Sequence, residues 1–439
     1  KIEGDITVDS GSKLIIEHQG SLVQVDDNAS VLNNGTIEVK KTTPVNTHDS
    51  FSILGSPMSG TTRGGAYAAN NVVMNHDTNQ FFLDDEVTAL DPLAVHFADE
   101  FGNNWNFMDG VDQINVTEGY LVGPTTQSVN DGDYELNYNQ GTLNNGVYTY
   151  DAMLHIDEDN SANILSNPYA SAIKADDFMG LNSTIIDVVY FWEHLTPPSG
   201  GYPGYRSENW NMGDISLINS TGGVAAPNGG IAPTNLIPSG QGFGVKAKTA
   251  GTVTFNNSLR VTGPNEGYRN NENTDRLLLK VENPIYHLQS GALIGFTEDA
   301  TDGYESNYDA RRLATPVSIY SIVEDKELAI QGRSTFNEDH VIPLGFRTQV
   351  EEVQIYTIAI SSIEGALISE ATVYLKDNVL NTRTNLNEGN YTFTSNEGNY
   401  KERFELVFTE EVLGNEDFND NLIGVYPNPS IGIINIASP

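Results

Sequence analysis

The chain of 439 residues carries 59 acidic and 22 basic residues, a formal net charge of -37, and no cysteine. So negative a chain repels phosphate backbones and anionic lipids, which argues against nucleic-acid and membrane-surface partners. The lack of cysteine excludes disulfides, thiolate zinc sites and cysteine catalysis. Hydrophobic residues make up 38% of the chain, which predicts a globular protein, and no apolar run reaches the roughly 18 residues of a membrane helix.

Residues 1–44 have a short, regular rhythm of turn residues and apolar residues. Between the turn residues lie the alternating pairs Ile6/Val8, Leu14/Ile16, Val23/Val25 and Ile37/Val39. Alternation with a period of two, bounded by Gly and Asn, predicts short strands. The regular spacing favours a β-solenoid-like repeat segment, with an ordinary β-meander as the alternative. The chain opens in the middle of this pattern, so we expect further turns upstream of residue 1.

Residues 48–262 contain an internal duplication. Three matches recur in one order: FSILGSPMSG (51–60) with ANILSNPYAS (162–171), NWNFMDG (104–110) with NWNMGD (209–214), and TEGYLV (117–122) with SGQGFGV (239–245). Three matches in register predict two copies of a β-rich unit, at about 48–155 and 156–262. The alignment places Trp105 and Trp210 at equivalent positions, which favours a packing role for both.

One long loop of the second copy is rich in aromatic residues. The stretch TPPSGGYPGYRSENW (196–210) holds Tyr202, Tyr205 and Trp210 beside Arg206. Such rings can form a stacking face for a glycan, and Trp105 is a further candidate. The alternative is a surface loop with its own local packing.

From Asp275 the pattern changes to eight strand-like runs separated by turn signals. These runs are RLLLKVEN, GALIGFTED, PVSIYSIV, KELAIQGR, VQIYTIAISS, ATVYLKD, NYTFTS and RFELVFTE. Such spacing predicts an antiparallel β-sandwich over 270–410, followed by an acidic linker at 411–421. Residues 170–181 predict the single short helix, so the whole chain is expected to be all-β.

The sequence holds no HExxH, no G-x-S-x-G and no Walker motif, so we expect no catalytic role for it. One acidic cluster stands out in FTEDATDGYESNYDARRL (296–313). It contains Asp299, Asp302, Glu305 and Asp309. Calcium binds carboxylate and carbonyl oxygens on loops of this kind, so these residues are a candidate calcium site. The alternative is that Asp309 pairs with Arg311 or Arg312 while the others cap turns.

The tail GVYPNPSIGIINI (424–436) resembles the start of the C-terminal sorting domain of proteins exported by the type IX secretion system of Bacteroidetes. The residues that match are Val425, Tyr426, Pro427, Asn428, Pro429 and Gly432. The two prolines restrict the backbone to a turn between two short strands. The resemblance implies that residues 422–439 start a small β-sandwich sorting domain, which continues beyond residue 439. It also implies recognition by the outer-membrane translocon and its shuttle and attachment machinery.

The body of the chain is similar to large flavobacterial surface proteins. ILSNPYASAI resembles a run that recurs in those proteins, and SGQGFGVKA, LAIQGR, IPLGF and RFELVF follow in the order found there. The resemblance implies a secreted or cell-surface, structural or adhesin-like protein with glycan or cell-surface partners and no transferable catalytic residue. The alternative function is the carbohydrate-binding part of a secreted polysaccharide-active protein. A third possibility, an enzyme active within this chain, has no motif in its favour.

Overall fold

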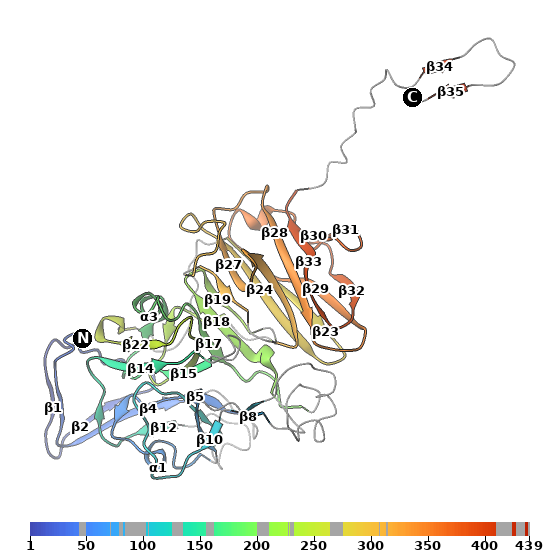
Figure 1. Cartoon of the computed structure of the whole chain (residues 1–439). Helices are drawn as coiled ribbons and strands as arrows, with labels where there is room; N and C mark the ends of the chain where they lie inside the picture. The colour runs from blue at the N-terminus through green and yellow to red at the C-terminus, as the bar shows by residue number, and fades with distance from the viewer. Residues whose placement is uncertain are drawn as a thin grey trace.

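The computed structural model describes most of the chain, from Lys1 to the short strand at 435–437. The described residues are 1–43, 50–70, 72–78, 82–83, 102–103, 105–124, 135–154, 162–199, 210–226, 228, 232–263, 275–306, 308–312, 315–409, 424–426 and 435–437. They are nearly all in strands and connecting turns (Figure 1). The predicted all-β class is confirmed.

The N-terminal segment consists of two layers of short strands that stack in parallel. Its strands are β1 (Ile6–Val8), β2 (Lys13–Ile16), β3 (Val31–Asn33) and β4 (Thr36–Thr42). Strand β1 pairs with β3, and β2 pairs with β4, both in parallel. Alternate residues of β4, Ile37 and Val39, are completely buried. The predicted run at Val23–Val25 is not a strand, although Gln24 forms an isolated parallel bridge with Ile2.

The next elements belong to the first copy of the predicted duplication. They are β5 (Ser52–Leu54), β6 (Met58–Ser59), α1 (Arg63–Ala66), β7 (Val73–His76), β8 (Phe82–Leu83), β9 (Gly102–Asn103), β10 (Trp105–Phe107), β11 (Tyr120–Val122), β12 (Glu135–Tyr138) and β13 (Thr142–Leu143). Four of them form an antiparallel sheet in the order β10-β7-β11-β5. Strand β12 instead pairs with β4, so the first copy and the N-terminal segment share one core.

The second group of elements has its own core. It comprises β14 (Tyr148–Ala152), β15 (Ala162–Ser166), β16 (Ile173–Lys174), α3 (Ala175–Leu181), β17 (Val189–Trp192), η4 (Met212–Asp214), β18 (Ile215–Asn219), β19 (Gly222–Val224), β20 (Leu236–Ile237), β21 (Gly242–Lys246), β22 (Gly251–Phe255) and η5 (Asn257–Leu259). Its main sheet has the order β15-β21-β17-β18-β19. Only the C-terminal part of the helix expected at 170–181 is helical, because Ile173–Lys174 pairs with β20 as a strand.

The same strand order occurs twice. The path β5-β11-β7-β10 matches β15-β21-β17-β18, and the flanking pair β4–β12 matches β14–β22. The two sheets are joined reciprocally, since Leu54 bridges to Gln241 and Leu165 bridges to Glu118. The backbone repeats this relation, because the N–H of Gly55 donates to Gly240 and that of Ser166 donates to Thr117. Each sheet therefore completes the other across a central seam.

Glycine is required at this seam where the strands approach most closely. A Cβ on Gly119 would lie 2.6 Å from the carbonyl oxygen of Leu165, and one on Gly242 would lie 2.3 Å from the Cγ2 of Ile53. Both distances are shorter than any normal contact, so a larger residue would push the two sheets apart. The two glycines come from the third pair of matched motifs, one from each copy.

The two tryptophans aligned by sequence do not occupy equivalent places. Trp105 begins β10 and pairs with His76 of β7. In the second copy the residue that pairs with the end of β17 is Ile215, opposite Trp192. Trp210 lies outside β18, ahead of the short helix η4. The sequence match at these tryptophans is therefore out of register with the strands, because the loop before β18 has a different length.

The C-terminal part is one sheet of eleven strands. These are β23 (Asp275–Asn283), β24 (Leu288–Phe296), β25 (Ala310–Arg311), β26 (Val317–Val323), β27 (Lys326–Arg333), β28 (Val341–Thr348), β29 (Gln354–Glu364), β30 (Tyr374–Asp377), β31 (Thr382–Asn385), β32 (Tyr391–Ser395) and β33 (Gly398–Val407), with η6 (Ile368–Glu370) between β29 and β30. The main path runs β31-β30-β33-β28-β26-β27-β24-β23-β29-β32. Inward-facing residues from both ends of this path meet in one core, so the sheet wraps round on itself.

Two details of the C-terminal sheet differ from the predicted antiparallel sandwich. Strands β24 and β27 pair in parallel, with Leu293 opposite Ile330. Strand β28, which was not among the eight predicted runs, lies in the middle of the path between β33 and β26. Proline at 343 and glycine at 345 weaken its strand signal in the sequence.

The C-terminal sheet packs against the second copy through a small apolar interface. Val188, Tyr190 and Leu217 of the second copy meet Leu293 and Ile330 of the sheet in one buried cluster. Figure 1 shows β17, β18 and β19 between the N-terminal half of the molecule and the C-terminal sheet. Beyond this sheet, β34 (Gly424–Tyr426) and β35 (Asn435–Ala437) pair antiparallel with each other.

Candidate functional sites

The acidic loop after β24 is held in place by its own carboxylates. Oδ1 of Asp302 accepts hydrogen bonds from the hydroxyl of Ser334, at 2.9 Å, and from its backbone N–H, at 3.2 Å. Oδ2 of Asp302 lies 3.4 Å from a guanidinium nitrogen of Arg333. Oε2 of Glu305 accepts the N–H of Thr301 at 2.6 Å. These contacts fix the loop against the end of β27.

Asp309 is the buried centre of this loop. Its side chain is completely buried, and its two oxygens accept the N–H of Gly332 at 2.9 Å and the N–H of Glu305 at 2.7 Å. Burial raises the pKa of Asp309 to about 6, although these two hydrogen bonds oppose the shift. Arg312 pairs with Glu327 at 2.6 Å. Asp302 and Glu305 thus accept backbone N–H groups, as the alternative expected, and Asp309 does so as well, where that alternative had paired it with Arg311 or Arg312.

Calcium binding by Asp299, Asp302, Glu305 and Asp309 stays a prediction. Among the described residues no three histidine, aspartate or glutamate side chains are grouped closely enough to hold a metal ion. Asp302, Glu305 and Asp309 instead point toward different protein donors. A calcium ion at this loop would therefore have to compete with backbone amides and with Arg333 for the same oxygens.

The buried Asp309 predicts a stability change between pH 4 and pH 7. Since its folded pKa is raised from 3.8 to about 6, the stability it contributes is fully present below pH 4. That contribution is lost as the pH rises through about 6, because the unfolded chain ionises first. The quantity to follow is the difference in unfolding free energy between the native protein and Asp309→Asn. We expect this difference to fall by on the order of 3 kcal/mol between pH 4 and pH 7.

Chemical denaturation at several pH values measures this difference. Burial also raises the pKa of Asp187 to about 6, but Asp187 titrates in both proteins and cancels in the subtraction. A difference that stays constant from pH 4 to pH 7 would show that Asp309 is already ionised throughout that range.

Of the candidate glycan-stacking residues in the 196–210 loop, the structure describes Trp210, whereas Tyr202 and Tyr205 lie outside the described residues, and the further candidate Trp105 packs edge to face on His76. The Trp210 side chain is 38% exposed. Its ring meets Phe51 edge to face at 4.9 Å, and Phe51 in turn stacks on Trp192 at 5.1 Å with an interplanar angle of 7°. His194 also meets Phe51 edge to face, at 5.4 Å. Trp210 is therefore the exposed edge of an aromatic cluster that links the two copies.

Sequence reasoning missed Phe51, Trp192 and His194 as members of this cluster. Phe51 lies more than a hundred residues before Trp192 and His194 in the chain, and it meets them only because the two sheets pair reciprocally. One signal was available: Phe51 aligns with Ala162 in the first pair of matched motifs, so the two copies differ sharply in size at that position.

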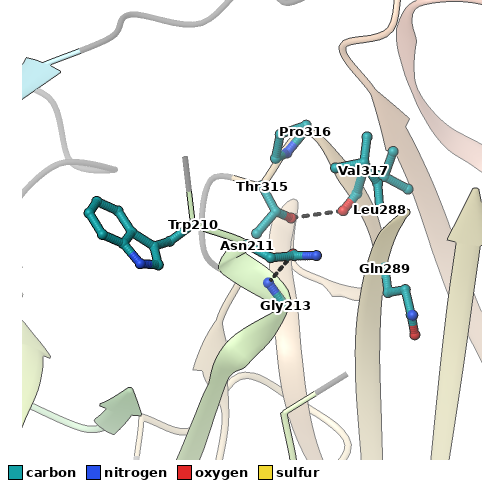
Figure 2. Close-up of a pocket in the computed structure, with 8 residues that line it drawn as sticks. All are labelled: Trp210, Asn211, Gly213, Leu288, Gln289, Thr315, Pro316 and Val317. Carbon is teal, nitrogen blue, oxygen red and sulfur yellow. Dashed lines mark hydrogen bonds between the residues drawn. The ribbon is translucent and has the colours of Figure 1, made fainter. Parts of the chain in front are cut away.

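A small crevice next to Trp210 is too narrow for a ligand. It lies between the η4 segment and the C-terminal sheet, has a volume of about 20 Å³, and is lined by Asn211, Gly213, Leu288, Gln289, Thr315, Pro316 and Val317 as well as Trp210 (Figure 2). Figure 2 shows the Trp210 ring pointing away from the other residues. Oδ1 of Asn211 accepts the N–H of Gly213 at 2.8 Å, and Nδ2 of Asn211 donates to the carbonyl of His287. The space suits at most a water molecule.

The sorting motif is described in part. Val425 and Tyr426 lie in β34, opposite Ile436 and Asn435 of β35. Pro427, Asn428, Pro429 and Gly432 lie outside the described residues. The segment that contains the two prolines thus connects two paired strands, as expected from the sequence pattern.

The fold and these sites define an all-β protein built from a parallel-stacked N-terminal segment, a reciprocally paired double sheet and a wrapped C-terminal sheet. None of the helices in the described ranges has the length and apolar character to cross a bilayer. The chain belongs to the family described as Domain of unknown function (DUF8693), which matches residues 1–408. No curated protein and no solved structure matches the chain.

Proposed function

We propose that this protein is a secreted or cell-surface structural, adhesin-like protein, exported through the type IX secretion system by its C-terminal segment. The observation that carries the proposal is the paired strand β34–β35, which brackets the Tyr-Pro-Asn-Pro segment of the tail. Its residues follow the last strand of the wrapped sheet and lie outside the 1–408 region of the family. A terminal hairpin whose two described strands pair with each other, and not with the wrapped sheet, suits a segment that export machinery recognises.

The packing of the rest of the chain supports a structural role. Residues of the N-terminal segment, such as Ile37, share a core with Tyr120 of the first copy. A second shared cluster joins Tyr190 of the second copy to Ile330 of the C-terminal sheet. Buried apolar residues shared across these boundaries hold the parts together, which suits a chain whose role is to present an exposed surface.

Deletion of residues 422–439 should prevent surface display and leave the protein in the periplasm. The remaining residues keep every core described above, so the deletion removes the export signal without unfolding the body. Fractionation of a type IX-competent bacterium, with antibody labelling of intact cells, measures the distribution.

The control is Val111→Ser in the full chain, which changes a side chain that is 81% exposed and far along the chain from the tail. This variant should reach the surface normally. Surface display of the deleted protein at the level of the control would overturn the proposed export route.

A further inference from the structure

A sizeable cavity lies at the seam between the two copies. Its volume is about 470 Å³, within the range of about 300–1,000 Å³ usual for small-molecule sites. The residues that line it are His76, Asp77, Thr78, Asn115, Val116, Thr117, Glu118, Gly119, Thr149, Tyr150, Asp151, Met153 and Ile164. They come from the end of β7, the turn before β11, and strands β14 and β15, so neither copy forms the cavity alone.

The lining is rich in groups that bond to hydroxyls. Oε2 of Glu118 accepts hydrogen bonds from the hydroxyl of Tyr120 at 2.8 Å and from Nδ2 of Asn115 at 3.0 Å, which fixes the carboxylate in place. Oδ1 of Asp151 accepts the hydroxyl of Thr252 at 3.0 Å. Threonine and tyrosine hydroxyls in the same wall can both donate and accept.

Two aromatic side chains of the wall are uncharged at neutral pH. Burial, and then the charge of Glu118, raise the pKa of Tyr150 to about 12, so its phenol keeps its proton. Burial lowers the pKa of His76 to about 4, so its imidazole is neutral. The acidic residues of the lining are Asp77, Glu118 and Asp151, and the described residues that line the cavity include no lysine or arginine.

The two copies carry different residues at equivalent positions beside the seam. The end of β17 carries Trp192, which stacks on Phe51, whereas the equivalent end of β7 carries His76. At the position equivalent to Phe51 stands Ala162, whose carbonyl accepts the hydroxyl of Thr78 at 3.0 Å. The aromatic cluster thus packs one side of the seam, whereas on the cavity side His76 meets Trp105 edge to face at 5.0 Å and Ala162 is small.

We infer that this cavity binds a neutral saccharide. An anionic ligand would face three carboxylates in a chain whose net charge is -37. A metal ion needs clustered ligands, and the described residues contain no such group. The three carboxylates come instead from separate elements, and the lining also carries hydroxyl and amide groups, which suits hydroxyls spread around a sugar ring. This inference adds a ligand to the adhesive role and does not depend on the export route.

Titration of the purified full chain tests the inference. Calorimetry and saturation-transfer NMR would use maltotriose, cellotriose, mannotriose and tri-N-acetylchitotriose as neutral probes, with trigalacturonate and spermidine as charged comparisons. We expect at least one neutral trisaccharide to bind with a Kd below about 1 mM. Ala162 lies two residues before the lining residue Ile164 on the same face of β15, so the larger ring of Ala162→Phe should intrude on the cavity and weaken binding by about tenfold or more.

Two further variants keep the test decisive. Glu118→Gln preserves the shape of the wall and removes one acceptor, so it should also weaken binding by about tenfold. This variant carries the test if Ala162→Phe does not fold. Trp210→Ala should leave binding unchanged, because Trp210 does not line the cavity. Binding that is lost only in Trp210→Ala, binding of spermidine in preference to every trisaccharide, or no saccharide binding at all would each overturn the inference.

Discussion

Replacement of Asp377 by alanine is expected to lower the stability of the C-terminal sheet by about 3–5 kcal/mol, because it leaves a buried arginine without its partner. Asp377 is completely buried at the end of β30, and Arg403 of β33 is only 8% exposed. Nε and Nη2 of Arg403 both donate to Oδ2 of Asp377, at 3.1 and 3.0 Å. The hydroxyl of Tyr391 donates to the same oxygen at 2.8 Å.

The other oxygen of Asp377 closes the turn that follows β30. Oδ1 accepts the backbone N–H groups of Val379 and Leu380, at 2.9 and 3.2 Å. The guanidinium of Arg403 lies over the rings of Phe393 and Phe404, at 4.5 and 5.0 Å from their centroids. One carboxylate therefore joins three strands and a turn, so its loss is not local.

The effect should depend on pH in a defined direction. Burial alone would raise the pKa of Asp377, but hydrogen bonds from Tyr391, Arg403 and the turn hold it below its usual value. A depressed pKa contributes stability above the unfolded value of about 3.9, and this contribution is lost as the pH falls through the folded pKa. Asp377→Asn should therefore differ most from the native protein at neutral pH and least in strong acid.

Hydrogen exchange of β30, β32 and β33 measures this prediction directly. The three tryptophans of the chain, Trp105, Trp192 and Trp210, all lie outside the C-terminal sheet. Tryptophan fluorescence therefore follows the rest of the molecule and serves as an internal control that should change little. A stability loss under about 1 kcal/mol in Asp377→Ala would mean that this pair behaves like an exposed ion pair.

Arg260→Ala should be the second severe change, with a loss of about 3 kcal/mol or more, since hydrogen bonds to charged groups contribute about 1.5–3 kcal/mol each. Arg260 is 3% exposed. Its guanidinium donates to the carbonyl of Leu22 at 2.6 Å, to Oδ1 of Asn145 at 2.9 Å and to Oδ1 of Asn257 at 3.0 Å. It also lies over the ring of Tyr169, at 4.6 Å.

These contacts connect the N-terminal segment to the second copy. Burial lowers the pKa of Arg260 to about 10, yet the group stays charged at neutral pH. Arg260→Lys keeps the charge without the planar fork and should recover only part of the stability. Lys13→Ala is the matched control, because Lys13 pairs with Glu38 at the surface and is 48% exposed. The control should cost at most about 1 kcal/mol in thermal or denaturant unfolding.

A result in which Arg260→Ala and Lys13→Ala have equal, small effects would contradict this role for Arg260. The N-terminal strands would then be held by apolar packing alone, through residues such as Ile37 and Val39. Hydrogen exchange in β2 and β4 separates the two cases, because loss of the Arg260 contacts should raise exchange there before it does so in β17.

Much of the strand content was predictable, for a local reason. Runs such as RLLLKVEN and KELAIQGR alternate or cluster apolar residues between turn signals, and each became a strand of the wrapped sheet. Strand β28 was missed because Pro343 and Gly345 interrupt its pattern. In the sheet Gly345 lies against the ring of Tyr320, a neighbour that the local pattern does not reveal.

The candidate sites were less predictable. The acidic loop was found by composition, but composition does not show that Asp309 is buried against Gly332 while Asp302 faces Arg333. The tryptophan match was misleading, because Trp105 pairs within a sheet and Trp210 precedes one. A match over a few residues shows only that two short segments have similar sequences. Which of their residues occupy equivalent positions in the strands depends on the lengths of the preceding loops.

By itself, the sequence determined the all-β class, the position of most strands, the lack of thiol chemistry and the resemblance of the tail to a sorting motif, because each depends on residues close together in the chain. Only the tertiary structure decided three other features. These are the reciprocal seam, the packed aromatic cluster at Phe51 and Trp192, and the cavity beside Tyr150. Their residues are brought together by pairing between two copies of one unit. The residues at equivalent positions, Phe51 against Ala162 and Trp192 against His76, differ sharply in size, and the larger pair lies on the packed side of the seam.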